Sequence, residues 1–322
     1  MDLDITIHRG AADRPAVIFI HGLGMGKYFW TNPLETKIFA GNIPLKVFAA
    51  TRPRPASIKS GKKLTIGSVP KKIDTLWTGL RDKGFSLLCW SQKRPLGPIN
   101  VAVEELGEIM HRAVRLFPDK PLALIGHSRG GLIARKFMEG EVPGIKALIT
   151  LSSPHSGTSL SRIGKRLSPL SGFLKGILPQ DTHGTVSGVL KNVTDLLEGN
   201  ALKELMPGSD FFRDLRDTAV DGIHYLSFGG TKTELLTIYK WEKQGDVLSP
   251  KPLLTIPDSL IKVFPDSILP DELCPGKGDV MVTAESSVLP WAERHYDLNV
   301  NHISIMWNSK VITRVIELLE GI

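Results

Sequence analysis

Five short, almost continuously apolar runs are spread along the 322-residue chain, at 15–22, 85–91, 122–128, 146–153 and 223–230. A strand that is apolar at every position has both faces buried, which is typical of a parallel sheet with a helical layer on each side. Segments with apolar residues at helical spacing occur at 72–83, 101–117, 131–138 and 303–319. This alternation predicts an α/β fold with a doubly wound, mostly parallel sheet.

Three stretches interrupt the alternation. Residues 25–70 are basic and rich in proline and glycine, residues 156–222 contain several weakly amphipathic segments, and residues 240–277 are proline-rich and expected to be irregular. One domain with an inserted cap fits this length better than two equal domains. We therefore predict a catalytic core formed by 1–155 and 223–322, with an insertion at 25–70 and a largely helical cap or lid at 156–222.

The composition narrows the possible partners. The net charge is +7, but the basic clusters at 52–54, 59–63 and 71–72 lack the interleaved aromatics of a nucleic-acid binder, so we expect a solvated surface and no nucleic-acid partner. The N-terminus does not resemble a signal peptide, and no apolar stretch reaches the roughly 18 residues of a membrane span, so we expect a cytoplasmic protein. The two cysteines, Cys89 and Cys274, allow one disulfide at most.

The third apolar run leads into LALIGHSRGGLIARKF, residues 122–137, in which Ser128 stands between Gly126 and Gly130. The pattern G-x-S-x-G alone arises by chance roughly 0.2 times in such a chain, but here a predicted strand precedes it and a predicted helix follows. This is the context of a nucleophile elbow, in which a strained turn lifts the serine hydroxyl clear of the backbone. The glycine patterns of dinucleotide-binding and P-loop turns are absent from the sequence. We therefore predict that Ser128 is a nucleophile.

A serine nucleophile needs a base and a group that orients the base, and in this architecture the acid precedes the histidine in the chain. His302 in LNVNHISIMW lies just ahead of the last predicted helix, whereas the alternative, His295, has a more charged, surface-like context. Asp279 in GKGDVMVTAESS lies at a glycine-flanked turn, and Asp246 in QGDVLSP is its rival. The predicted triad is Ser128, Asp279 and His302.

Backbone amides are expected to stabilise the oxyanion of the transition state. One is the amide of Arg129, which follows the nucleophile, and the other is the amide of Leu23 in FIHGLGMG. We assign this role to the amide of Arg129 and not to its guanidinium. Leu23, His127 and Leu160 are predicted to contact the substrate.

Six motifs together resemble the α/β-hydrolase superfamily, and more narrowly its lipase branch, which includes bacterial lipases and the relatives of lecithin–cholesterol acyltransferase and of glycosylphosphatidylinositol deacylases. They are VIFIHGLG, ALIGHSRGGLIAR, LITLSSPHSGT, LMPGSDFFRDL, GDVMVTAESS and the NH pair at 301–302. The resemblance implies Ser128 as nucleophile, His302 as base and Asp279 as the orienting acid. Position 129 is arginine where many lipases have methionine or glutamine. Some bacterial lipases hold a structural metal, but the sequence has no matching ligand cluster, so we expect no metal and no cofactor.

These observations predict a serine carboxylic-ester hydrolase that acts through an acyl-enzyme on a small-molecule ester or lipid with an apolar acyl chain. The apolar residues of the predicted lid would cover the acyl site, and Lys165, Arg166 and Lys175 would favour reversible contact with a membrane surface. Two alternatives stay open. The same triad could serve an acyltransferase or thioesterase, or the fold could belong to a non-catalytic binding protein.

Overall fold

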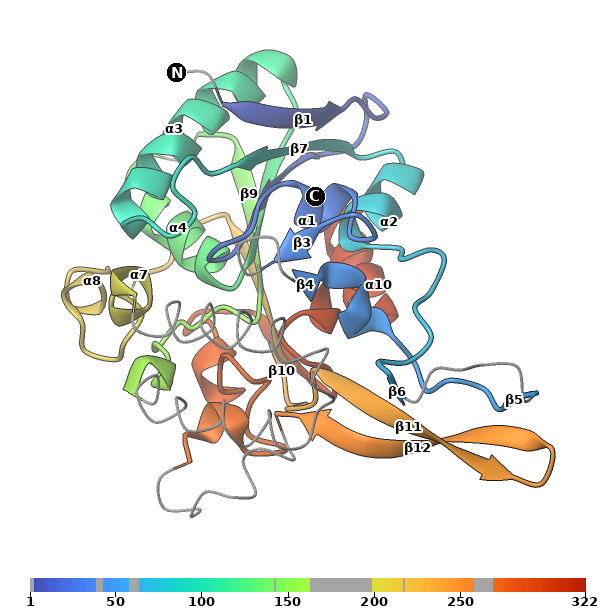
Figure 1. Cartoon of the computed structure of the whole chain (residues 1–322). Helices are drawn as coiled ribbons and strands as arrows, with labels where there is room; N and C mark the ends of the chain where they lie inside the picture. Colours follow the sequence, from blue (N-terminus) through green and yellow to red (C-terminus); the bar gives the residue numbers. More distant parts are fainter. Residues whose placement is uncertain are drawn as a thin grey trace.

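The computed structural model describes residues 3–38, 43–57, 64–141, 143–162, 199–216, 218–257 and 269–322. At its centre is a seven-stranded sheet with the order β1-β7-β2-β8-β9-β10-β13 (Figure 1). The strands are β1 (Asp4–His8), β2 (Ala16–Ile20), β7 (Ser86–Ser91), β8 (Leu122–His127), β9 (Ile145–Leu151), β10 (His224–Gly230) and β13 (Arg294–Leu298). Neighbouring strands of this sheet are parallel except for β1, which is antiparallel to β7. The predicted fold class is confirmed.

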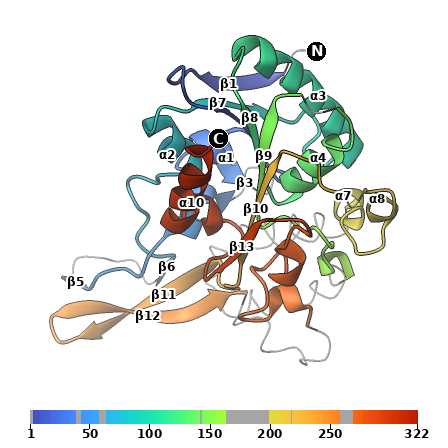
Figure 2. The same ribbon diagram turned by 180° about the vertical axis from the view of Figure 1, so that it is seen from behind.

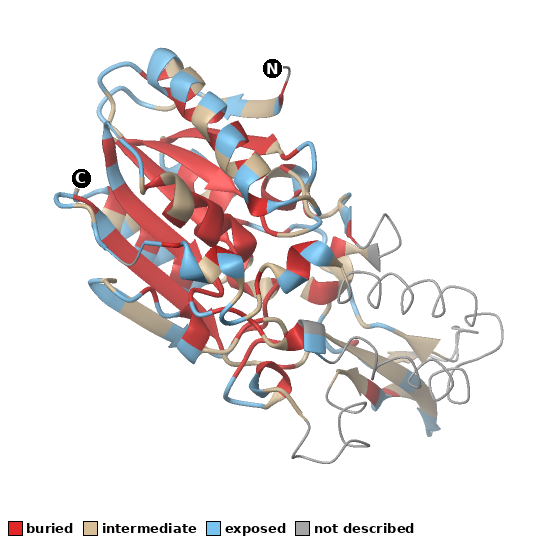
Figure 3. Cartoon of the chain, turned by 90° about the vertical axis from the view of Figure 1, so that its left-hand side faces the viewer, coloured by how far each residue is buried: buried red, intermediate tan, exposed pale blue. Residues whose placement is uncertain are grey.

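Helices cover both faces of the sheet (Figures 1 and 2). One layer contains α3 (Ile99–Leu116) and α4 (Arg129–Phe137), and the other contains α2 (Leu76–Asp82) and α10 (Ser309–Leu319). Alternate residues of β2 enter different cores, because Ile18 packs with α3 and α4 whereas Phe19 packs with α2 and α10. This burial on both sides, seen as red strands in Figure 3, explains why the strands are continuously apolar.

All five predicted strands form, and each predicted helical segment contains a helix. The last one differs in extent: α10 begins only at Ser309, because the Asn308 side chain accepts hydrogen bonds from the amides of Lys310 and Val311 and caps the helix there. Residues Ser304–Trp307 form a separate 3-10 turn, η8. The prediction of one continuous helix over 303–319 is therefore wrong at its start.

The expectation of an irregular stretch at 240–277 is also wrong in its first part. β11 (Leu236–Gln244) and β12 (Val247–Ile256) form a long antiparallel ribbon that projects from the body of the molecule (Figures 1 and 2). The short strands β5 (Ala56–Ser57) and β6 (Leu64–Thr65) complete a four-stranded sheet with it. Within the described residues, β5 pairs with β12 at Val247 and Leu248, and the two prolines of β12 lie beyond this pairing.

The insertion at 25–70 contributes to the core and is not simply a loop. It contains α1 (Tyr28–Thr31), β3 (Lys37–Ile38), β4 (Ile43–Pro44) and the 3-10 helix η1 (Leu45–Ala49). Phe29, Trp30, Leu45 and Phe48 are buried in the cluster that lies under α2 and α10.

Only the two ends of the predicted lid belong to the described residues. They contain η2 (Leu160–Arg162), α7 (Asn200–Lys203) and α8 (Asp210–Arg213). Residues 163–198, which include Lys165, Arg166 and Lys175, lie outside the described part, so the lid stays a prediction. Among the helices that the structure describes, none has the length and apolar character needed to cross a bilayer.

Candidate active site

Ser128 occupies the turn between β8 and α4, with φ 54° and ψ −128°. Residues other than glycine rarely adopt a positive φ, and such strain is found mainly where function requires it. Two backbone hydrogen bonds hold the turn: the Ser128 amide donates to the Leu151 carbonyl at 2.9 Å, and the Ser128 carbonyl accepts from the Gly131 amide at 3.1 Å. The Ser128 side chain does not cap α4. This is the backbone conformation expected of a nucleophile elbow.

The flanking glycines are required by close backbone approach. A Cβ at Gly126 would lie 2.4 Å from the Gly131 nitrogen, and a Cβ at Gly130 would lie 2.3 Å from the Ile20 carbonyl oxygen. Both distances are far below van der Waals contact and both involve backbone atoms. The turn can therefore form in this position only with glycine on either side of His127-Ser128-Arg129.

Asp279 and His302 form a buried pair. The His302 Nδ1 lies 3.0 Å from the Asp279 Oδ2, and the side chains are 4% and 1% exposed, respectively. The other carboxylate oxygen, Oδ1, accepts from the amides of Met281 and Val282 at 3.0 and 2.8 Å. This arrangement fixes the carboxylate as an acceptor for Nδ1–H, so that the neutral imidazole keeps its lone pair on Nε2.

The sheet brings this pair to the same edge as Ser128. A Cβ at Gly230, the last residue of β10, would lie 2.7 Å from the Asp279 Cβ, so Asp279 packs directly on the end of that strand. His302 follows β13, and its carbonyl oxygen lies 2.8 Å from the Nε2 of His127. The two imidazole rings are 4.8 Å apart. Because His127 immediately precedes Ser128, the pair lies beside the elbow.

The loop after β2 packs against the elbow as well. A Cβ at Gly22 would lie 2.9 Å from the Ser128 Cβ, which places the His21-Gly22-Leu23 loop beside the serine. On the other side, Arg129 is the first residue of α4, and the first amides of a helix have no acceptor within the helix. Arg129 thus follows Ser128 directly, and the loop that contains Leu23 packs against the serine through Gly22.

Comparison with known proteins agrees with the fold described above. A sequence model described as the alpha/beta hydrolase fold matches residues 88–178. The propeptide form of the lipase BlEst2 from Bacillus licheniformis superposes with a TM-score of 0.51 at 16% identity, covering 98% of this chain and 53% of that one. Its mature form gives a TM-score of 0.49 at 15% identity and coverages of 98% and 97%. A lipase-esterase related protein of Clostridium acetobutylicum gives 0.46 at 11% identity and coverages of 98% and 99%. No curated protein matches the sequence.

The chain has the α/β-hydrolase fold. At sequence identities of 11–16%, the structural similarity supports the fold but does not indicate a particular activity. The roles of individual residues in this α/β-hydrolase-fold protein therefore rest on the geometry of its own site.

The alternative acid and base lie in other surroundings. The His295 Nδ1 lies 2.8 Å from the Ser227 Oγ, and its Nε2 lies 3.0 Å from Asp297, within a group formed by β10 and β13. Asp246 is exposed between β11 and β12, at the tip of the ribbon (Figure 1). Of the candidates weighed from sequence, only Asp279 and His302 form a pair beside the elbow.

Two of the predicted substrate contacts occupy different positions from those we expected. His127 has no exposed surface and packs between Phe29, Trp30 and His302. Burial, with a smaller contribution from His302, holds its pKa well below the ordinary value, so it is a neutral donor to the His302 carbonyl. Leu160 is 3% exposed and belongs to the hydrophobic core. Leu23 alone of the three is partly exposed.

Glu272, which the sequence did not single out, anchors the chain where the predicted lid begins. It is buried and accepts hydrogen bonds from the Ser159 amide at 2.6 Å, the Ser159 hydroxyl at 2.8 Å and the Thr158 hydroxyl at 3.1 Å. Its carbonyl also accepts from the Val280 amide at 3.0 Å, next to Asp279. Only a three-dimensional structure shows this link, because 113 residues separate Ser159 from Glu272.

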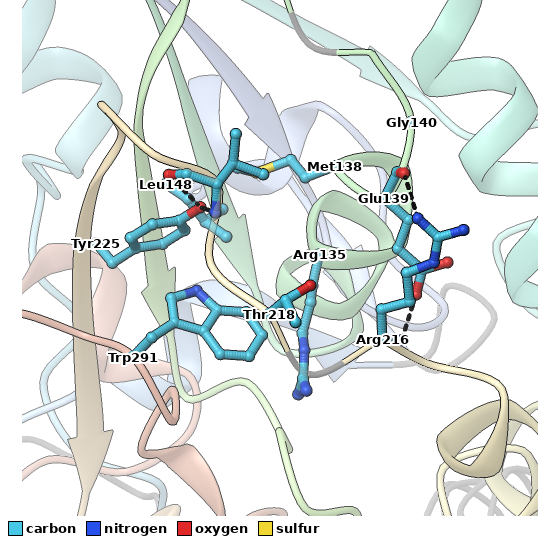
Figure 4. A pocket seen from close by; sticks show the side chains of 10 residues that line it. Arg135, Met138, Glu139, Gly140, Leu148, Arg216, Thr218, Tyr225 and Trp291 are labelled. Carbon is cyan, nitrogen blue, oxygen red and sulfur yellow. Dashed lines mark hydrogen bonds between the residues drawn. The ribbon is translucent and has the colours of Figure 1, made fainter.

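A cavity of about 140 Å³ lies elsewhere, between the C-terminal end of α4 and strands β9 and β10 (Figure 4). Arg135, Met138, Arg216, Tyr225 and Trp291 are among its lining residues, whereas the predicted triad is not. Within the described residues, no group of three acidic, histidine or cysteine side chains could hold a metal ion.

Proposed function

We propose that this α/β-hydrolase-fold protein is a serine carboxylic-ester hydrolase acting on esters with an apolar acyl chain. The observation that carries the proposal is the buried His302–Asp279 pair, with 3.0 Å between Nδ1 and Oδ2, beside a serine in a strained strand-to-helix turn. A hydrogen-bonded imidazole and carboxylate next to an activated serine is the arrangement that acyl transfer requires.

In the proposed reaction, the Ser128 Oγ attacks the acyl carbon while the His302 Nε2 takes its proton. Asp279 keeps the imidazole oriented and stabilises the imidazolium that forms. The amides of Leu23 and Arg129 donate to the carbonyl oxygen as it becomes negatively charged. His302 then donates the proton to the leaving alcohol, which leaves an acyl-enzyme. Water next attacks the acyl carbon while His302 takes its proton, and His302 returns that proton to the Ser128 Oγ as the carboxylic acid is released.

An apolar acyl chain is proposed on the grounds that the solved structures with this fold include proteins named as lipases, and that partly exposed Leu23 adjoins the elbow. Reversible contact with a lipid surface stays part of this proposal. A series of p-nitrophenyl esters with acyl chains of increasing length would measure the preference directly. Rates that fall steadily from acetate to decanoate would contradict it.

The proposal is tested by Ser128→Ala, with Ser156→Ala as the matched control because Ser156 is an exposed serine in the segment that follows β9. We expect purified Ser128→Ala to lose p-nitrophenyl ester hydrolysis and Ser156→Ala to keep it. Full turnover by Ser128→Ala would overturn the proposed function. Products analysed with a competing alcohol would show acyl transfer in place of hydrolysis if the acceptor is not water.

A further inference from the structure

The side chain of Arg129 is the largest charged group that the structure buries completely. Its guanidinium reaches the loop after β7 and donates three hydrogen bonds there: Nη1 to the Gly97 carbonyl at 2.6 Å, and Nη2 to the Gln92 Oε1 at 2.8 Å and the Pro95 carbonyl at 3.1 Å. Burial lowers the pKa of Arg129 to about 10, while the charges of Glu204 and Glu105 act in the opposite direction, so the group stays cationic at neutral pH. A buried cation is retained only where such contacts offset its desolvation.

The loop at 92–97, to which the Arg129 side chain binds, is bonded in turn to the loop at 21–24. We call the latter the oxyanion loop because it contains Leu23. Gln92 forms two hydrogen bonds to His21. Its backbone N–H donates to the His21 Nε2 and its side-chain Nε2 donates to the His21 carbonyl, both at 3.0 Å. The Pro95 carbonyl accepts from the Gly24 amide at 3.0 Å as well as from Arg129. Leu23 therefore lies between two residues, His21 and Gly24, that are both fastened to the segment held by Arg129.

Arg129 therefore influences the position of both predicted oxyanion donors. The backbone of Arg129 carries one donor at the start of α4, and its side chain fixes the loop that carries the other. The two segments that Arg129 connects are the elbow and the oxyanion loop, from which the two predicted oxyanion donors come. Charge-assisted bonds to three acceptors leave little freedom for that loop to move.

We propose that the Arg129 guanidinium is a positioning group for the oxyanion hole, which sets the Leu23 amide through Gln92 and Pro95. The proposal rests on the proposed function. It revises our prediction from sequence, which gave Arg129 a role through its amide alone. Oxyanion donors act only when they point at the place where the charge develops, so a loosened Leu23 loop weakens transition-state binding more than substrate binding.

The test compares Arg129→Met with Arg135→Met, in which a second buried arginine of α4, outside the proposed machinery, is changed in the same way. The readouts are kcat, KM and the inhibition constant of an alkyl trifluoromethyl ketone. Ser128 adds to the carbonyl carbon of this ketone, its proton passes to His302, and the carbonyl oxygen becomes an oxyanion. We expect Arg129→Met to lower kcat and to weaken the ketone by roughly ten- to hundredfold, with KM changed by less than about threefold. Arg135→Met should leave the ratio of the inhibition constant to KM unchanged.

Gln92→Met keeps the proposal testable if Arg129→Met does not fold. It removes the side-chain bonds of Gln92 to Arg129 and to the His21 carbonyl, and it leaves the backbone bond of Gln92 to His21 and the bonds of Arg129 to Gly97 and Pro95 in place. It should shift the same ratio in the same direction. Unchanged ketone inhibition in folded Arg129→Met or, failing that, in Gln92→Met would overturn the positioning role. Loss of turnover in Ser128→Ala together with that result means that only this inference fails. Full turnover in Ser128→Ala would remove both proposals.

Discussion

His302 and Asp279 are joined twice. The imidazole Nδ1 lies 3.0 Å from the carboxylate Oδ2, and the His302 amide donates to the Asp279 carbonyl, also at 3.0 Å. The backbone bond fixes the spacing of the two residues independently of their side chains. A change in the carboxylate should therefore alter the chemistry of the imidazole without displacing it.

Asp279→Asn tests this expectation. The asparagine side chain is similar in size, but it presents an amide where the carboxylate accepted a hydrogen bond, which favours the wrong imidazole tautomer and no longer stabilises the imidazolium. We expect kcat for ester hydrolysis to fall by roughly 10³- to 10⁴-fold. Asp271→Asn, at an exposed aspartate paired with Lys277, is the control and should retain full activity. A loss of less than about tenfold in Asp279→Asn would argue against its role.

His127→Phe tests the support behind His302. The phenyl ring fills a similar volume but leaves the buried His302 carbonyl without the donor that now lies 2.8 Å away. An unsatisfied buried acceptor costs about 1–3 kcal/mol, so the free energy of unfolding in urea should fall by that amount. We also expect kcat to decrease, because the backbone of His302 is no longer fixed. Equal stability and kcat in the variant and the wild type would contradict this assignment. His111→Phe, at an exposed position, is the control.

Acid should destabilise the fold before most carboxylates titrate. Burial lowers the pKa of His21 to about 4 and that of His155 to about 3, and it lowers the pKa of His127 well below 6.5. Below pH 6.5 the unfolded chain therefore binds protons that the folded protein does not, so stability is retained above pH 6.5 and is lost as the pH falls towards 4.

Each of the three histidines contributes a slope of up to about 1.4 kcal/mol per pH unit in this window. Urea unfolding at pH 7, 6 and 5 should show the decline, and His155→Gln should reduce the slope by about a third. His111→Gln should leave the slope as it is. A free energy of unfolding that does not change between pH 7 and pH 5 would show that the buried histidines are not held neutral.

Two glycines should respond oppositely to alanine. A methyl group at Gly126 meets the backbone of Gly130 and Gly131 at 2.4–2.6 Å, whereas one at Gly107, inside α3, first meets the Phe137 ring at 3.9 Å. Gly126→Ala should destabilise the protein by about 3 kcal/mol or more, because backbone atoms must move. Gly107→Ala should raise stability by up to about 1 kcal/mol, because alanine favours the helix. Thermal unfolding of both variants measures the difference, and a stable, active Gly126→Ala would contradict the close-packed elbow.

The sequence was sufficient for the parts of the fold that repeat a simple pattern. The strands of the parallel sheet are buried on both faces, so their apolar runs stand out, and the order of Ser128, Asp279 and His302 followed from the fold that those runs predict. β1 and β13 were missed. Both lie at the edges of the sheet, and their residues are mostly half-buried or exposed, so neither forms a continuous apolar run.

Contacts between distant segments could not be predicted in this way. The ribbon of β11 and β12 could not be predicted, because β12 contains prolines, which are uncommon inside strands and here lie next to a bulge of the ribbon. The sequence predicts a role for the Arg129 amide alone, because it does not reveal that Gln92 and Pro95 lie within reach of the side chain. The burial of His127 and Leu160, which the sequence predicts to contact the substrate, likewise depends on tertiary packing.

The most direct test of the central claim is covalent labelling of the protein with an alkyl p-nitrophenyl phosphonate, followed by peptide mass spectrometry. Attack by an activated serine on phosphorus releases p-nitrophenol and leaves the phosphonyl group on the serine oxygen. We predict one label per chain, on Ser128, with complete loss of esterase activity, and slow labelling in His302→Ala. A label on another residue, or full esterase activity after Ser128 has been modified, would contradict the account.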